Sequence, residues 1–244
     1  MNSGLILAAA AAAFSLAASP ARAETRSLEL DPFDRIAITS GIGAVVTVGG
    51  EQAISIESDN PELLGRLRID VRDGTLRAEI DYNWLDTLLG GGILATIFGE
   101  RPQVTIRISV PALTGAEATS GALVEIDKLN GESLRLEASS GARLEVATIE
   151  AGTLDAESTS GATLVAAAGS CERLNADASS GATLDLGKLE CAEVIASASS
   201  GATARVFARD LIDAEASSGA SVAVLGEPER SRVNSSSGGN VRLD

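Results

Sequence analysis

The chain has 244 residues, a formal net charge of −15 and no histidine. The acidic balance disfavours binding to nucleic acid and anionic lipid headgroups, because both carry negative charge. The absence of histidine removes the commonest general base, the usual catalytic zinc ligand and the Ser-His-Asp triad. Aromatic residues, at 2%, are too few for the stacking platforms typical of sugar or base recognition.

Residues 1–23 have the pattern of a secretory signal peptide. Residues 5–18 are apolar or small apart from Ser15, and Ala21-Arg22-Ala23 is a small-x-small cleavage site. A membrane anchor is the competing interpretation, but the apolar run is short for a span and is followed by Pro20. We expect cleavage after Ala23, which leaves 18 basic and 34 acidic residues, a net charge of 18 − 34 = −16.

Residues 24–112 are predicted to form an N-terminal β region that caps a longer structure. Apolar and polar residues alternate with the period of a strand in six segments, at 35–38, 44–48, 53–57, 67–71, 75–80 and 104–110. Thr39-Ser40-Gly41 resembles the repeated motif described below. A cap is expected because the open end of a stacked-repeat protein exposes unpaired strand edges.

An apolar insertion at residues 82–101 interrupts these strands. It contains Trp84, the only tryptophan, and three consecutive glycines. One interpretation is a flap over the open end of the stack. The alternative is an exposed patch that contacts lipid, a partner or a second copy of the chain, with the candidate contact residues Trp84, Leu88, Leu89, Ile93, Leu94, Ile97 and Phe98.

Residues 113–244 are dominated by a repeated Ser/Thr-Ser-Gly-Ala motif. Its glycines are separated by 20, 20, 20, 20, 18 and 19 residues, at Gly121, Gly141, Gly161, Gly181, Gly201, Gly219 and Gly238. Apolar residues alternate with polar ones on both sides of each glycine, as in Leu144, Leu164 and Leu184 three positions later. Two short strands therefore meet at a Ser-Gly bend in every repeat.

The repeat predicts a right-handed parallel β-helix with coils of about 20 residues. One such unit cannot bury its apolar face alone, whereas stacking successive units in register buries a continuous core. Right-handed winding is the usual hand of parallel β connections. The glycine serves either a positive φ angle or close approach between coils.

The order of these segments resembles one bacterial domain family. Phe33-Asp34-Arg35-Ile36 and the segment 104–113, which ends in Val-Pro-Ala-Leu, are followed by the Ser-Gly-Ala repeats. This order is similar to that of the family described as a putative auto-transporter adhesin, head GIN domain. The resemblance implies an exported β-helical domain, periplasmic or on the surface of a bacterium, with no catalytic residues to carry over.

Cys171 and Cys191 stand at the same position of consecutive repeats, 20 residues apart. In a register-stacked solenoid they would lie one above the other, within reach of a disulfide. An exported protein meets an oxidising compartment, so we expect a structural disulfide. The alternative is a pair of free, buried thiols. A metal site is not expected, because the chain has no histidine and no further cysteine.

Outward positions of the repeat carry carboxylates and hydroxyls in rows. One acidic row contains Glu137, Glu157, Asp177 and Glu215, interrupted by Ser197, and another contains Glu125, Glu145 and Asp185. Ca²⁺ binding would relieve the repulsion between them, but a solvated, solubilising face is favoured. The Ser and Thr rows beside the bends have two interpretations. They form a polar comb for a glycan or an ice-like surface, or their hydroxyls satisfy backbone groups of the turns. The second interpretation is favoured.

These features favour a non-catalytic envelope or surface module that binds or scaffolds an envelope protein or glycan. An alternative is a polysaccharide-acting β-helix enzyme of the lyase or esterase type, with Asp177, Asp185 and Arg205 as candidate residues on one face. Another is a self-associating structural element. The enzyme is disfavoured because the regular coils lack the long loops that build a cleft. No cofactor is expected.

Overall fold

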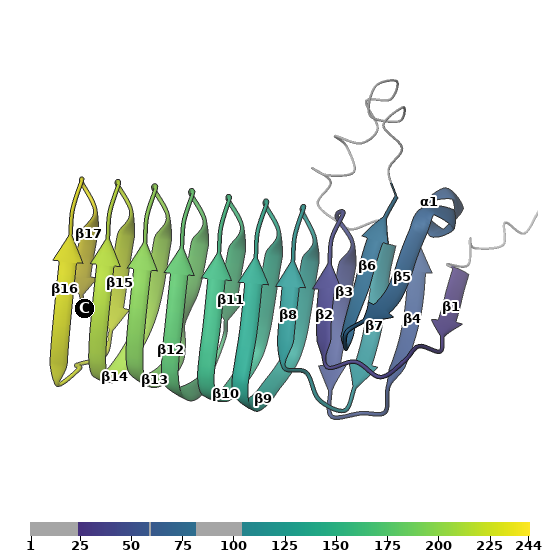
Figure 1. Cartoon of the computed structure of the whole chain (residues 1–244), viewed down its shortest axis with the longest axis horizontal. Helices are drawn as coiled ribbons and strands as arrows, with labels where there is room; N and C mark the ends of the chain where they lie inside the picture. The colour runs from purple at the N-terminus through teal and green to yellow at the C-terminus, as the bar shows by residue number, and fades with distance from the viewer. Residues whose placement is uncertain (1–23, 59, 82–103) are drawn as a thin grey trace, which may run out of the picture.

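The computed structural model describes residues 24–58, 60–81 and 104–244 (Figure 1). The structure is 68% strand and 3% helix and forms a parallel β-solenoid of about 6 turns, about 20 residues apart. This confirms the β-helix predicted from the repeat. Within the described residues, no helix is long and apolar enough to span a bilayer. The signal-peptide prediction falls on residues 1–23, outside the described part of the chain.

Each coil consists of two walls, joined at one end by a tight turn and at the other by a wider corner (Figure 1). The first wall contains β5 (Leu67–Arg72), β6 (Thr75–Ile80), β2 (Arg35–Ile38), β8 (Gly115–Ala118), the second halves of β9 (Leu123–Ala138), β10 (Arg143–Ser158), β13 (Thr183–Ala198) and β14 (Thr203–Ala216), and also β12 (Gly169–Ala178) and β16 (Arg230–Ser235).

The second wall lies opposite the first and is built from the other strands. It contains β1 (Glu24–Leu28), β4 (Ala53–Ser58), β7 (Val104–Val110), β3 (Gly43–Val48), the first halves of β9, β10, β13 and β14, and β11 (Thr163–Ala166), β15 (Ser221–Leu225) and β17 (Asn240–Leu243). The strands β9, β10, β13 and β14 continue through the corner and so belong to both walls.

The tight turns are made by Ser-Gly pairs with positive φ at both residues. In the third repeat these angles are 53° at Ser160 and 71° at Gly161, and the amide of Ala162 donates a 3.1 Å hydrogen bond to the carbonyl of Thr159. This is the geometry of a type I′ turn, which favours glycine because an L side chain is strained there. A Cβ added at Gly161 would meet nothing within 4 Å. The φ angle, and not close approach, therefore explains the repeated glycine.

Equivalent residues of successive coils lie in register along the solenoid. Leu144 pairs with Leu164 and Leu164 with Leu184, and all three side chains are fully buried. On the first wall, one inward column has alanine in most coils, at Ala156, Ala176, Ala196 and Ala214 after Leu136, and the column beside it has larger side chains, Leu134, Leu154, Leu174, Val194 and Ile212. Each fully buried leucine contributes roughly 1.5–3 kcal/mol of hydrophobic free energy. The apolar positions of the repeat thus form one continuous core.

The first Ser-Gly coil is distant in sequence from the coil that it contacts. Strands β2 and β3 pair with β8 and β9, and Thr119 Oγ1 donates a 3.0 Å hydrogen bond to Thr39 Oγ1, 80 residues away. The turn at Ser40 and Gly41 has φ angles of 62° and 69°. The resemblance of this segment to the repeat is therefore confirmed: it forms a coil of the solenoid.

The remaining N-terminal elements lie beyond this first coil. On the second wall, β4 pairs antiparallel with both β7 and β1. On the first wall, β5 and β6 form an antiparallel hairpin around Asp73 and Gly74, and β6 continues the parallel stack. The short helix α1 (Pro61–Arg66) begins at Asn60, whose side chain accepts hydrogen bonds from the amides of Glu62 and Leu63.

Candidate binding surface

The outer side of the first wall carries a row of carboxylates one coil apart. Glu117, Glu137, Glu157 and Asp177 are consecutive partners in register, followed by Ser197 and then Glu215. Neighbouring parallel strands lie roughly 4.8 Å apart, so these carboxylates repel one another. The row predicted from the repeat is present, and it extends one coil further towards the N-terminus.

Basic and amide side chains on the same wall offset part of this repulsion. The guanidinium of Arg135 contacts Glu137 and lies 4.0 Å from Glu157. The contact with Glu137 is the main reason that the pKa of Arg135 is raised above its ordinary value. The amide of Asn175 donates a 2.7 Å hydrogen bond to Asp155. The face is therefore a mixed polar surface with an excess of negative charge.

A row of hydroxyls runs beside the carboxylates, next to the tight turns. It contains Thr39, Thr119, Ser139, Thr159, Ser179, Ser199 and Ser217, all of them partly exposed. The turn glycines bond to backbone: the amide of Gly141 donates a 3.1 Å hydrogen bond to the carbonyl of Ser160 in the next coil. These amides do not depend on the hydroxyls, contrary to the interpretation favoured from sequence. Thr119 and Thr39 of this row hydrogen-bond to each other, and the row as a whole lies at the surface beside the carboxylates.

Three surface hollows follow one another along this wall. The largest, about 760 Å³, lies where the β5–β6 hairpin meets β2 and β8, and Arg77, Glu79 and Glu117 line it. The second, about 420 Å³, is lined by Glu137 and Asn175 among others, and the third, about 390 Å³, by side chains further along the wall. The three hollows thus lie in a line parallel to the solenoid axis, and together they are called the trough below. Sequence reasoning did not find these hollows.

The residues proposed for a polysaccharide-acting enzyme do not converge. Asp177 points outward from the first wall, in the carboxylate row described above. Asp185 and Arg205 are register partners on the outer side of the second wall. The expectation that they share one face is wrong, because the two halves of each coil lie on opposite sides of the core. These three residues form no common site.

The second wall carries the shorter acidic row. Glu125 and Glu145 are register partners, followed by Val165, Asp185 and Arg205. The shallow hollow on this side, about 340 Å³, has a more apolar lining. In the described residues there is no group of three or more His, Cys, Asp or Glu side chains that could hold a metal ion.

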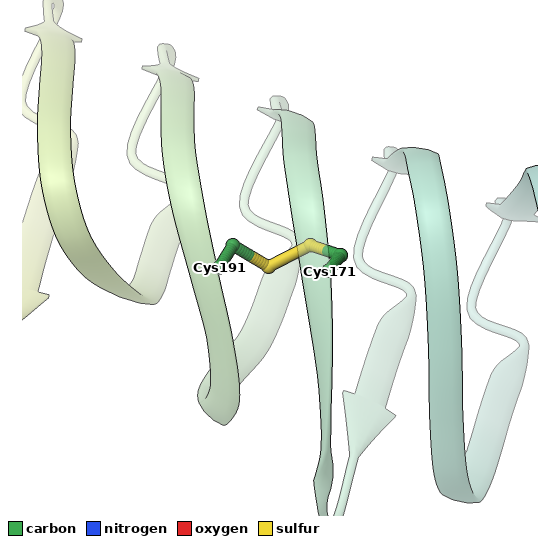
Figure 2. The surroundings of a disulfide bond; sticks show 2 residues. All are labelled: Cys171 and Cys191. Atoms are coloured by element: carbon green, nitrogen blue, oxygen red, sulfur yellow. A yellow bond between two sulfur atoms is a disulfide. The ribbon is translucent and has the colours of Figure 1, made fainter.

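Cys171 and Cys191 are joined by a disulfide across two neighbouring coils (Figure 2). They are register partners with a Cα–Cα distance of 4.4 Å, and both side chains are buried. Ala151 and Ala208 are their partners in the coils on either side. The disulfide thus lies in an inward column of small residues, away from the polar face, and has a structural place in the core.

The apolar contact patch predicted at Trp84, Leu88, Leu89, Ile93, Leu94, Ile97 and Phe98 falls on residues 82–103. These residues lie outside the described part of the chain. The patch remains a prediction.

The sequence matches the family described as putative auto-transporter adhesin, head GIN domain, over residues 32–228. The chain belongs to this family. The match includes the first Ser-Gly coil and all of the hollows described above. The resemblance inferred from the Val-Pro-Ala-Leu segment and the repeats is confirmed. No curated protein matches the sequence.

Solved structures of similar fold support the architecture of this GIN-domain chain. A putative adhesin from Bacteroides fragilis has a TM-score of 0.77 at 17% identity, over 91% of this chain and 97% of that one. A putative lipid binding protein from Parabacteroides distasonis gives 0.65 at 14% identity, over 92% and 98%. A putative adhesin from Parabacteroides merdae gives 0.65 at 15% identity, over 92% and 97%. At these identities the likeness shows the fold.

Proposed function

We propose that this GIN-domain protein is a non-catalytic, exported binding module of the bacterial envelope, and that it holds its ligand in the trough of the first wall. The observation that carries the proposal is the alignment of three polar hollows along one wall of a rigid, regular solenoid. An elongated site of this kind suits an extended ligand, such as a glycan chain or an extended segment of an envelope protein.

Membership of a family named for adhesins supports a surface-binding role. The structural neighbours carry related names, two of them as adhesins and one as a lipid binding protein. An anionic lipid is a less suitable ligand than a glycan or a protein segment, because the acidic trough repels negatively charged headgroups. The buried disulfide supports export, because disulfides persist in oxidising compartments.

Matched pairs of substitutions on the two walls test which face binds. Glu137→Lys with Glu157→Lys reverses two charges in the trough, and Glu125→Lys with Glu145→Lys reverses two charges in the same strands on the opposite wall. The pairs are matched in that each also removes the ion-pair partners of one arginine: Glu137 and Glu157 for Arg135, and Glu145 for Arg143. We expect the trough variant to lose binding to envelope fractions and the opposite-wall variant to retain it.

Binding is measured as retention of purified, labelled protein on isolated envelopes, with circular dichroism to verify that both variants are folded. Equal retention of both variants and the unaltered protein would exclude the trough as the binding face. Loss of binding only in the Glu125 and Glu145 variant would assign function to the second wall instead.

A further inference from the structure

We propose that the coil around Ile195 and Ser197 is a saccharide subsite that accepts a neutral pyranose unit of a glycan chain. This inference rests on the proposed binding role of the trough and adds the chemistry of one position within it. It comes from the place where the regular pattern of the first wall is broken.

Ile195 breaks a polar row that runs beside the carboxylate row. Its register partners one coil before and after are Asn175 and Asp213, and the row continues with Asp155 and Arg232. Ile195 is 50% exposed. In the described part of the chain the other large exposed apolar side chains are Val233 and Leu243, both in the last coil. Within a polar row, Ile195 thus provides a local apolar surface that a ligand with an apolar face would bury.

Ser197 breaks the carboxylate row in the same coil. Its register partners are Asp177 and Glu215, so a short side chain stands between two longer acidic ones. Ser197 lines both of the smaller hollows, and so do Asp177 and Glu157. The two hollows therefore border each other at Ser197, and Ile195 lines one of them.

The two departures together match the chemistry of a sugar ring. A pyranose has an apolar C–H face and a rim of hydroxyl groups. The aliphatic side chain of Ile195 supplies the apolar platform that aromatic residues usually provide, and this chain has few aromatics. Asn175, Asp177 and Ser197 offer acceptors and donors at the edge of the platform. An apolar floor with a few polar groups is the usual composition of a small-molecule site.

The surrounding charge predicts the kind of sugar. Glu157, Asp177 and Glu215 line the hollow nearer the tight turns. Arg135 lines the hollow that contains Ile195, but so do Glu137, Asp155, Glu157 and Asp177, and the Arg135 guanidinium contacts Glu137 and lies 4.0 Å from Glu157. The excess charge around Ile195 is therefore negative. A uronic acid or sialic acid would bring a further carboxylate close to these groups and would be repelled. The subsite should therefore take neutral sugars and exclude acidic ones.

Regularising substitutions test this inference without disturbing the fold. Ile195→Asn places at this position the residue of the preceding coil, and Ser197→Gln restores a side chain the size of the neighbouring glutamates without changing the charge. Val165→Gln is the matched control, because it likewise puts a side chain of glutamate size into the gap of an acidic row, here on the second wall between Glu145 and Asp185. The probes are neutral hexasaccharides of glucose, mannose and N-acetylglucosamine, and a hexamer of galacturonic acid, titrated calorimetrically into the disulfide-bonded mature chain.

We expect at least one neutral hexasaccharide to bind, and the galacturonate hexamer not to bind. Ile195→Asn and Ser197→Gln should each weaken the binding by about tenfold or more, and Val165→Gln should leave it unchanged. Binding that is insensitive to Ile195→Asn and Ser197→Gln overturns the subsite, and so does failure of every neutral hexasaccharide to bind. Neither result contradicts the proposed function, which is tested separately by the retention of the Glu137 and Glu157 variant on envelopes.

Discussion

At the scale of single residues, the backbone conformation of the turns explains the Ser-Gly pairs of the repeat. Eight Ser-Gly pairs in the described residues have positive φ at both positions. A serine in this region costs about 1–2 kcal/mol, so the turns are held by their surroundings. The amide of Gly161, for example, donates a 3.1 Å hydrogen bond to the carbonyl of Ser180 in the next coil. Stacked turns thus support one another.

Gly161→Ala tests the conformational argument. We expect it to lower the free energy of unfolding by about 1 kcal/mol, because alanine is strained at positive φ although its Cβ meets nothing within 4 Å. Gly169→Ala should cost clearly more, since its Cβ would also overlap the carbonyl oxygen of Ile149 at 1.9 Å. Urea denaturation followed by circular dichroism compares the two variants. An equal cost for both would contradict this explanation.

At the scale of elements, neighbouring coils are joined by backbone hydrogen bonds, by stacked apolar columns and, at one point, by a covalent bond. The disulfide between Cys171 and Cys191 lies between β12 and β13, and it closes a loop with a sequence separation of 20 residues. Alanine occupies the equivalent position in the coil before and the coil after. The column can therefore accept alanine at both cysteine positions with little change in packing.

The double substitution Cys171→Ala and Cys191→Ala should preserve the fold but lower the free energy of unfolding by about 3 kcal/mol. The reason is that a cross-link of this loop length removes entropy from the unfolded chain. Urea denaturation of the oxidised, reduced and double-alanine proteins measures this difference in the free energy of unfolding. The reduced and double-alanine forms should agree; if the oxidised form is no more stable than they are, the bond contributes nothing.

At the scale of the whole molecule, acidic side chains lie one above another along the solenoid. The net charge is −15, and the row Glu117, Glu137, Glu157 and Asp177 puts carboxylates on adjacent strands. Like charges directly opposite each other on neighbouring strands destabilise a sheet. We expect the same charge to oppose lateral association of the sheets of neighbouring molecules.

Salt should therefore stabilise this protein. Raising NaCl from about 0.02 M to about 0.2 M shortens the screening length to below about 8 Å, and we expect the midpoint of urea denaturation to rise. Glu157→Gln removes the central charge of the row, so its midpoint should respond less to salt. A midpoint that falls with salt, or an unchanged response in Glu157→Gln, would show that repulsion along this row is unimportant.

Much of the solenoid could be predicted from the sequence, including the bends, the inward columns at Leu144, Leu164 and Leu184, and the acidic row. The binding surface was predicted only in part. Ile195 stands six residues before its repeat glycine, where the other repeats have Gly115, Arg135, Asp155, Asn175, Asp213 and Arg232. This departure from the repeat was the signal in the sequence that pointed to a binding surface. The alternation of apolar and polar residues shows which side chains are exposed, but not which of them border a hollow.

The amino-acid sequence by itself determined the stacking of the repeats. In a parallel solenoid the neighbour of each residue along the axis is the equivalent residue one repeat later, so the period of the sequence is also the register of the sheet. Only the tertiary structure decided which wall each polar row occupies and which distant segment completes the stack. Asp177 and Asp185 are separated by the core, and β2 meets β8 across 80 residues, because alternation specifies inside and outside but not the partner across a long connection.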